Sequence, residues 1–233
     1  MIEYPTKTMA VGGVTLIVRC NSSDDAVVTG IIAGDEYLLT ERNFSGWAID
    51  LGAHIGSASV LLLSRNPDLR VIAVEPLPGN VDILAQNLAP YGERAVIVAA
   101  AAGDGDSIEI GYDFGGIDLP EDYRISNHFI GRHLPDGKSD RETVTVPTVT
   151  LVGLMAEHGI DEIALVKTDC EGGEYQFFAD PAANARVRVI VGEWHDDSGQ
   201  RIRELLAGTH DFVRFAPVRP SGDVTGLFEA IRR

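Results

Sequence analysis

Four carboxylates each follow an apolar run that is typical of a buried strand. They are Asp50, Glu75, Asp169 and Glu193. When strands of this kind run parallel, their carboxyl ends meet at one edge of the sheet, and ligands bind there. We therefore expect these side chains to share a single site, where a carboxylate can hold a cationic ligand or take a proton from a reacting group.

The stretch 47–56 predicts a ligand-binding turn between a strand and a helix. Gly52 lets the backbone turn sharply and approach a ligand closely, because glycine has no side chain to clash. Gly56 opens the following helix, whose N-terminal amides can receive a carboxylate or another anion. Glu75, at the end of the next apolar run, can accept both hydroxyl protons of a ribose. Together these features predict a βαβ nucleotide-binding half.

Asp50 narrows the choice of nucleotide. It stands where the G-x-G-x-x-G fingerprint of dinucleotide-binding proteins has its first glycine. A carboxylate there would repel a pyrophosphate, whereas it suits an ammonium or sulfonium charge. S-adenosylmethionine carries both of these charges, and also a carboxylate for the helix end. We therefore expect S-adenosylmethionine as the cofactor, ahead of a dinucleotide or of a tight turn that binds no ligand.

A second group of polar residues is placed to activate a methyl acceptor. An alcohol must lose its proton when it is methylated, and a carboxylate or imidazole within hydrogen-bond reach can take it. His195 is the first candidate for this base and Asp169 is the second. The alternatives are an exposed loop position for His195 and a helix-capping role for Asp169 and Glu171, because Thr168-x-x-Glu171 fits a capping box.

A divalent cation is another means of activating the acceptor, because a metal acidifies and orients a bound hydroxyl. Asp169, Glu193 and His195 offer oxygen and nitrogen ligands for Mg²⁺ or Mn²⁺. Their spacing does not demand a metal, so the cation stays an open alternative beside a side-chain base.

Lys167 ends an apolar strand in a chain that has three lysines against sixteen arginines. An unpaired buried ammonium is costly. We therefore expect Lys167 to pair with a buried carboxylate such as Glu171, Glu174 or Glu193, in a role that is either structural or catalytic.

The elements that must position these residues alternate between strand and helix. This order predicts an α/β fold, with a mainly parallel sheet and helices on both faces. A hairpin is expected over 9–19, around Gly12-Gly13, and a helix from about Ser23 to Ala33. Residues 95–101 predict a third apolar strand.

A single domain is expected over residues 1–233. Its predicted parts are an N-terminal extension (1–45), a cofactor-binding half (46–110), an irregular segment (111–142) and the second half of the sheet (143–233). The irregular segment is rich in Gly, Asp, Pro and Arg. Such a segment inside a compact domain is usually functional or mobile, and we expect it to form the acceptor pocket or a lid over it.

Composition excludes several classes of partner. The net charge is −16 without a basic patch, and phosphate binding needs clustered Lys and Arg, so no nucleic acid is expected. No uncharged stretch approaches the roughly 18 residues of a membrane span, and Met1–Pro5 lacks the charged-then-apolar start of a secretion signal. We therefore expect no membrane partner and a cytoplasmic location. Cys20 and Cys170 are expected to be free thiols, and the sequence does not indicate an oligomeric state.

Several motifs follow one another in an order that resembles a known family. They are G-D-E-Y (34–37), D-L-G-A-H-I-G (50–56), V-E-P-L-P-G-N (74–80), Asn87, V-P-T-V-T-L (146–151), L-V-K-T-D-C-E-G-G-E (165–174) and G-E-W-H (192–195). This series resembles the FkbM-like family of S-adenosylmethionine-dependent methyltransferases. The resemblance covers roughly residues 30–195 and is specific because several motifs occur together.

The resemblance implies a Rossmann-like class I methyltransferase fold with a seven-stranded sheet, and a small-molecule hydroxyl of a natural product, sugar or glycoside as acceptor. The cofactor-binding residues that we expect on this basis are Tyr37, Asp50, Gly52, Ala53, His54, Ile55, Gly56, Glu75, Pro76, Asn80, Ala101 and Asp169. Near the reacting centre we expect Lys167, Asp169, Glu171, Glu174, Glu193 and His195. The family commonly has Asn where His54 stands and an aliphatic residue where Cys170 stands. A nitrogen or carboxylate acceptor, or a cofactor-binding protein without activity, are the alternatives.

Overall fold

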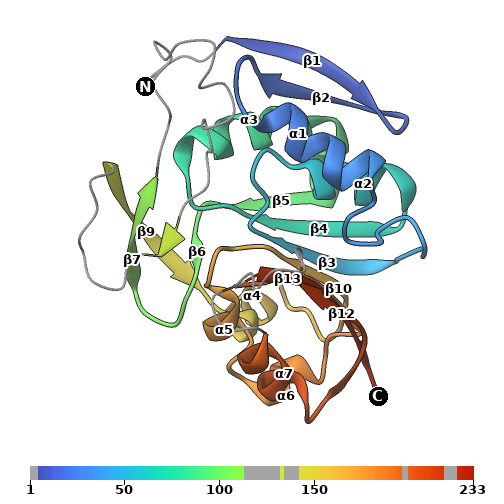
Figure 1. Ribbon diagram of the computed structural model, residues 1–233, viewed down its shortest axis with the longest axis vertical. Helices are drawn as coiled ribbons and strands as arrows, with labels where there is room; N and C mark the ends of the chain where they lie inside the picture. The colour runs from blue at the N-terminus through green and yellow to red at the C-terminus, as the bar shows by residue number, and fades with distance from the viewer. Residues whose placement is uncertain (1–4, 113–131, 134–141, 196–198, 218–224) are drawn as a thin grey trace.

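The computed structural model describes residues 5–112, 132–133, 142–195, 199–217 and 225–233 (Figure 1). The irregular segment 111–142 therefore lies mostly outside the described residues, and the lid expected there stays a prediction. The division of the chain into a single domain likewise stays a prediction. Within the described residues, no helix has both the length and the apolar character needed to cross a membrane.

A seven-stranded sheet forms the centre of the molecule, in the order β12-β13-β11-β10-β3-β4-β5. The strands are β3 (Gly46–Leu51), β4 (Leu69–Val74), β5 (Ala95–Val98), β10 (Ile163–Thr168), β11 (Val189–His195), β12 (His210–Pro217) and β13 (Thr225–Arg232). The five strands from β11 to β5 run parallel, whereas β13 is antiparallel to both of its neighbours. The predicted mainly parallel sheet is confirmed.

Helices cover both faces of this sheet, because its strands are apolar on both sides. Ala48 packs into one core layer and the next residue, Ile49, into the other. The first layer lies under α1 (Asp24–Val28), α2 (Ser57–Arg65) and α3 (Pro78–Leu88). The second lies under α4 (Leu151–Glu157), α5 (Glu174–Phe177), α6 (Pro181–Asn184) and α7 (Gln200–Leu206), as Figure 1 shows.

The N-terminal segment adds a hairpin outside the first helical layer. Strands β1 (Thr6–Val11) and β2 (Val14–Arg19) pair antiparallel around Gly12-Gly13, which confirms the predicted hairpin. Asn87 of α3 attaches it by accepting the N–H of Ile17 at 2.6 Å and donating to the Ile17 carbonyl at 3.0 Å. The helix expected after Ser23 also forms, and α1 continues as a π-helical turn, η1 (Thr29–Ala33).

A second, four-stranded sheet was not predicted. Its order is β6-β9-β7-β8, with β6 (Ala101–Ala102), β7 (Ser107–Tyr112), β8 (Arg132–His133) and β9 (Glu142–Val149). The single strand expected over 95–101 is wrong in this respect. The chain leaves β5 at Val98, where the N–H of Ala100 donates to the Val98 carbonyl at 3.0 Å, and β6 pairs with β9 instead.

Candidate active site

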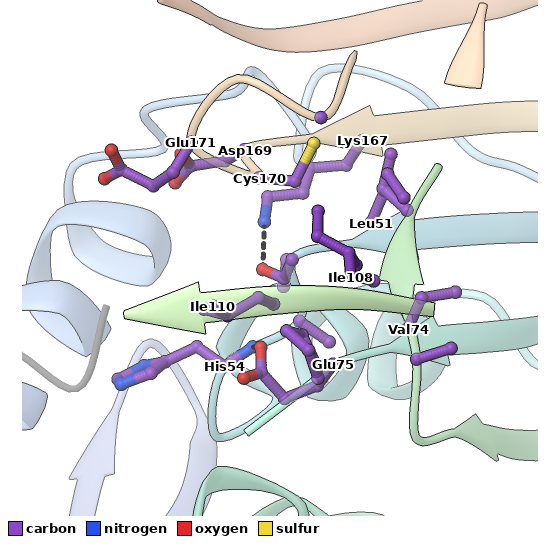
Figure 2. A pocket seen from close by; sticks show the side chains of 18 of the residues that line it. Leu51, His54, Val74, Glu75, Ile108, Ile110, Lys167, Asp169, Cys170 and Glu171 are labelled. Carbon is purple, nitrogen blue, oxygen red and sulfur yellow. Dashed lines mark hydrogen bonds between the residues drawn. The ribbon is translucent and has the colours of Figure 1, made fainter. Parts of the chain in front are cut away.

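A cavity of about 1000 Å³, with the open space at its mouth included, lies where β3, β4 and β10 end. The carboxyl ends of parallel strands form it, as expected. Figure 2 shows Asp169, Cys170 and Glu171 on the loop that follows β10, and Glu75 just beyond β4.

Gly52 is the turn residue at which strand β3 meets the loop after β10. Its φ of +74° lies in the left-handed region, and a Cβ there would stand 1.8 Å from the carbonyl oxygen of Asp169. The close approach that the sequence indicated is therefore made to the protein's own backbone. The N–H groups of Gly52 and Ala53 both donate to the Val74 carbonyl, at 3.0 and 2.9 Å. These bonds fix the turn at the edge of the cavity.

Asp50 has a different role from the one expected. It is fully buried and is not among the residues that line the cavity. Its Oδ2 accepts from the N–H and hydroxyl of Ser59, at 3.0 and 2.7 Å, and its Oδ1 lies 3.2 Å from Lys167 Nζ. The anion at the start of α2 is thus the protein's own Asp50. The expectation that this carboxylate faces a cationic ligand is corrected, because Lys167 already neutralises it.

Lys167 pairs with Asp50 because the two residues are register partners on adjacent strands, β10 and β3. Its ammonium also donates to the Gly52 carbonyl at 2.8 Å, the contact drawn in Figure 2. The expected pairing with a buried carboxylate is confirmed, but its partner is Asp50 and not Glu171, Glu174 or Glu193. Burial alone lowers the pKa of Lys167, but Asp50 and Asp169 outweigh it and raise that pKa, so the ammonium stays charged.

Glu75 lines the cavity and is held by three N–H donors. Its Oε1 accepts from the backbone of Leu77 at 3.0 Å and from Asn80 Nδ2 at 2.9 Å, and its Oε2 accepts from the N–H of His54 at 2.9 Å. Burial raises its pKa, although these donors oppose the shift. A carboxylate oxygen accepts two hydrogen bonds, so Oε2 retains capacity for a ribose hydroxyl. The residues present fit the expected nucleoside.

A buried ion pair from the N-terminal segment supports this part of the site, and sequence reasoning missed it. The guanidinium of Arg19 donates to both carboxylate oxygens of Asp24 at 2.9 Å, to Asn80 Oδ1 at 2.8 Å, and lies 3.2 Å from His54 Nε2. Burial is the main reason that the pKa of His54 is lowered to about 4. His54 is therefore neutral at pH 7. An arginine at the end of an apolar strand was the available signal, as it was for Lys167.

We call the connected residues Arg19, Asp24, Asp50, His54, Glu75, Asn80 and Lys167 the turn network. A second group consists mainly of carboxylates, and we call it the acidic cluster. Its members are Glu36, Asp169, Glu171, Glu174, Glu193 and His195. Burial and the charge of Asp169 raise the pKa of Glu36, and the same two causes raise that of Glu193 to about 7. Asp169 therefore raises the pKa of two other carboxyl groups in this cluster.

Glu174 orients His195 from beneath the cluster. It is fully buried, and its Oε1 lies 3.0 Å from His195 Nδ1 and accepts the His195 backbone N–H at 3.1 Å. The hydroxyl of Tyr175 donates to the His195 carbonyl. Burial by itself lowers the pKa of His195, but the hydrogen bond and charge of Glu174, with Asp169 and Glu171, raise it to about 9. The imidazole is thus protonated at neutral pH in the protein without ligands.

Asp169 joins the two groups. It lines the cavity, its Oδ2 accepts the hydroxyl of Tyr37 at 2.8 Å, and its Oδ1 lies 3.9 Å from His195 Nε2. Tyr37, which we expected against the cofactor, is buried and holds this carboxylate instead. One ligand atom each from Asp169, Glu171 and His195 lie within 4.8 Å of one another. Glu193, which we expected as a metal ligand with Asp169 and His195, is not in this group, and a metal here stays a prediction.

The structure brings together part of each predicted set. The expected cofactor residues that line the cavity are Gly52, Ala53, His54, Glu75, Pro76, Ala101 and Asp169. The expected cofactor residues that are not among its lining residues are Tyr37, Asp50, Ile55, Gly56 and Asn80. Of the expected catalytic residues, Lys167, Asp169 and Glu171 line the cavity, whereas Glu193 and His195 do not. Apolar lining residues that sequence reasoning missed include Val27, Ile31, Ile108 and Ile110.

Residues 50–215 match the family model described as the Methyltransferase FkbM domain. The chain is also 29% identical over 175 residues to the AMB antimetabolite synthetase AmbE of Pseudomonas aeruginosa. That alignment covers 64% of this chain but 8% of the relative, so the chain spans a small part of the curated protein that it matches.

Solved structures resemble the whole fold. An rRNA methylase from Streptococcus thermophilus matches with a TM-score of 0.51 and 8% identity, over 87% of this chain and 95% of that one. Trm5b from Pyrococcus abyssi matches with a TM-score of 0.52 and 11% identity, over 97% of this chain and 55% of that one. At such low identity the likeness concerns the fold alone, which is the Rossmann-like methyltransferase fold.

Proposed function

Because this chain belongs to the FkbM methyltransferase family, we propose that it methylates a hydroxyl oxygen of a small molecule. The methyl donor of this methyltransferase is S-adenosylmethionine. The observation that carries the proposal is the position of Asp169. Its carboxylate lines the cavity beside the glycine turn and also belongs to the acidic cluster. A group in that position is next to the cofactor and next to the acceptor at once.

The turn network holds the cofactor in this proposal. Glu75 accepts the ribose hydroxyls through Oε2, and Gly52, Ala53 and His54 form the wall beside it. When bound, S-adenosylmethionine supplies a methyl group on a positively charged sulfur, and the acceptor oxygen takes that methyl as the carbon–sulfur bond breaks. The paired charges of Asp50 and Lys167 keep the turn rigid without presenting a net charge to the ligand.

The acidic cluster positions the acceptor and receives its proton. Tyr37 orients the Asp169 carboxylate, which lies at the cavity and accepts the hydroxyl hydrogen of the acceptor. The carboxylates of Asp169 and Glu171, which line the cavity, repel a carboxylate acceptor, and this favours a neutral hydroxyl over a carboxyl group. The name of the curated relative, an antimetabolite synthetase, supports an acceptor from secondary metabolism.

A turnover screen tests the proposal. Purified protein is incubated with S-adenosylmethionine and a panel of hydroxylated metabolites and glycosides, and S-adenosylhomocysteine and the methylated product are measured by mass spectrometry. We expect Asp169→Asn to lower kcat by about 100-fold or more, as the loss of a proton acceptor does. Affinity for S-adenosylhomocysteine should change less than threefold.

Asp211→Asn is the matched control, because it removes the same charge from an exposed residue that pairs with Arg233 at 2.8 Å. Its turnover should equal that of the wild type. Methylation of nitrogen acceptors alone, or full activity in Asp169→Asn, would contradict the proposal.

A further inference from the structure

We propose that Asp169, Glu171 and His195 form a binding site for a divalent metal cation at the wall of the cavity. The inference deepens the proposed function and rests on it for the role of the cation, which is to orient and acidify the acceptor hydroxyl. Binding of the cation itself is a separate property of these three side chains, and it does not depend on which acceptor is used.

The separations between the three groups suit a cation. His195 Nε2 lies 3.9 Å from Asp169 Oδ1 and 4.0 Å from Glu171 Oε2, and the three ligand atoms lie within 4.8 Å of one another. At metal–ligand distances of about 2.1 Å, neighbouring ligand atoms of an octahedral site are about 3 Å apart and opposite ones about 4.2 Å. Adjustments of about 1 Å or less in two partly exposed carboxylates bring the set into this range.

His195 supplies the independent indication that something binds here. Its side chain is 95% buried, and Nε2 makes no hydrogen bond with any residue in the described part of the chain. That nitrogen is aimed at the two carboxylates from a distance too long for a direct hydrogen bond. Neutral imidazole is a common metal ligand, so a cation bound between the three groups takes the place of the Nε2 proton.

The surroundings have the arrangement of an outer ligand shell. Histidines that bind metals usually hydrogen-bond through their other ring nitrogen to a carboxylate, and His195 Nδ1 lies 3.0 Å from Glu174 Oε1. Tyr37 holds the second oxygen of Asp169 by a 2.8 Å hydrogen bond. Both contacts fix a ligand side chain while leaving its metal-facing atom available.

Two of the three ligands reach the cavity. Asp169 and Glu171 line it, and His195 lies behind them. A cation with three protein ligands keeps coordination positions for an acceptor oxygen and water. Lys167, which also lines the cavity, is paired with Asp50 at 3.2 Å and donates to Gly52.

Electron paramagnetic resonance with Mn²⁺ tests the site on the full chain after treatment with a chelator and its removal. We expect one saturable Mn²⁺ per chain. Glu171→Gln and His195→Gln should each weaken its Kd at least tenfold, and Glu174→Gln by about 10- to 100-fold. The matched control is Glu193→Gln, which removes a nearby carboxylate outside the ligand set and should change the Kd less than threefold.

Circular dichroism and S-adenosylhomocysteine binding establish that each variant is folded. The proposal is overturned if the folded wild type shows no saturable binding at millimolar Mn²⁺, or if Glu193→Gln weakens the Kd as much as Glu171→Gln does. The binding measurement is made without a methyl acceptor, so it tests the metal site independently of the proposed hydroxyl methylation. Mn²⁺ binding without hydroxyl methylation would refute the proposed function and leave the metal site standing.

Discussion

The turn network and the acidic cluster lie side by side but differ in how their charged side chains are paired. In the turn network, buried charges meet partners at hydrogen-bond distance, such as Arg19 with Asp24 and Lys167 with Asp50. In the acidic cluster, carboxylates gather around His195, and among the described residues Glu174 alone lies within 3.5 Å of its ring nitrogens. Among the described residues, short ion pairs of opposite charge therefore characterise the turn network, and neighbouring carboxylates characterise the acidic cluster.

Two buried histidines express this difference. The pKa of His54 in the turn network is lowered to about 4, mainly by burial, whereas that of His195 in the acidic cluster is raised to about 9 despite burial. Strongly shifted pKa values collect at functional sites. In the proposed function, the turn network positions the cofactor through fixed hydrogen bonds, and the acidic cluster acts on the acceptor through its charge.

The largest expected effect comes from breaking a completed pair. Arg19→Met leaves the fully buried Asp24 without its guanidinium partner, and loss of one member of a buried ion pair costs about 3–5 kcal/mol. Urea unfolding followed by circular dichroism measures this loss in the free energy of unfolding.

Lys7→Met is the control, because Lys7 lies in the same hairpin as Arg19 and also pairs with a carboxylate of α1, that of Asp25, but both side chains are about half exposed. It should leave the free energy of unfolding close to that of the wild type. Equal losses in the two variants would mean that the Arg19 pair is not a buried structural element.

In the metal-free protein, the pKa values of the two histidines should be shifted in opposite directions from that of a free histidine. NMR of the imidazole protons should show His54 neutral down to about pH 4 and His195 charged up to about pH 9. The folded pKa of His195 is raised, so its contribution to stability is full below about pH 6.5 and is lost as the pH rises through 9. The contribution of His54 is present above about pH 6.5 and is lost as the pH falls towards 4.

Each histidine contributes roughly 3 kcal/mol in this way. Glu174→Gln should lower the pKa of His195 and leave that of His54 in place, because Glu174 is the main cause of the first shift and not of the second. If both histidines titrate near their ordinary pKa, the contrast between the two regions is wrong.

The elements of the fold were largely predictable because their signals are local. Runs such as 46–51 and 163–168 are apolar on both faces, and a strand with that pattern belongs in the middle of a helix-covered sheet. The break after Val98 was missed because the alanines that follow it are as apolar as the strand. Their pairing with β9 depends on the tertiary structure and leaves no local signal in the sequence.

Side-chain partners were less predictable because they depend on register and loop path. Nothing near Lys167 in the sequence indicates Asp50, which lies opposite it only through the register of β10 and β3. Glu171 and Glu193 are both acidic residues near strand ends. The loop after β10 brings Glu171 to within 4.0 Å of His195 Nε2, and spacing along the chain did not reveal this.

The boundary between the two regions gives the next prediction. Gly52→Ala places a Cβ 1.8 Å from the Asp169 carbonyl, so the turn and the loop after β10 must separate. Gly13→Ala is the control, because its φ of +83° imposes similar backbone strain but a Cβ there meets nothing within 4 Å. We expect Gly52→Ala to lose about 2 kcal/mol more in unfolding free energy than Gly13→Ala, and to bind S-adenosylhomocysteine more weakly. Equal losses would show that the two regions are not in contact at this point.

The smallest effect should come from Tyr37→Phe, which tests whether Tyr37 serves the cofactor, as the sequence indicated, or Asp169, as the structure shows. The substitution removes the 2.8 Å hydrogen bond to Asp169 Oδ2 and keeps the ring near Lys167 Nζ. We expect kcat to fall about tenfold, which corresponds to about 1.4 kcal/mol. The Kd for S-adenosylhomocysteine should change less than twofold, because Tyr37 is not part of the cavity lining. The reverse result, a weaker Kd with an unchanged kcat, would return Tyr37 to the cofactor and assign it to the turn network.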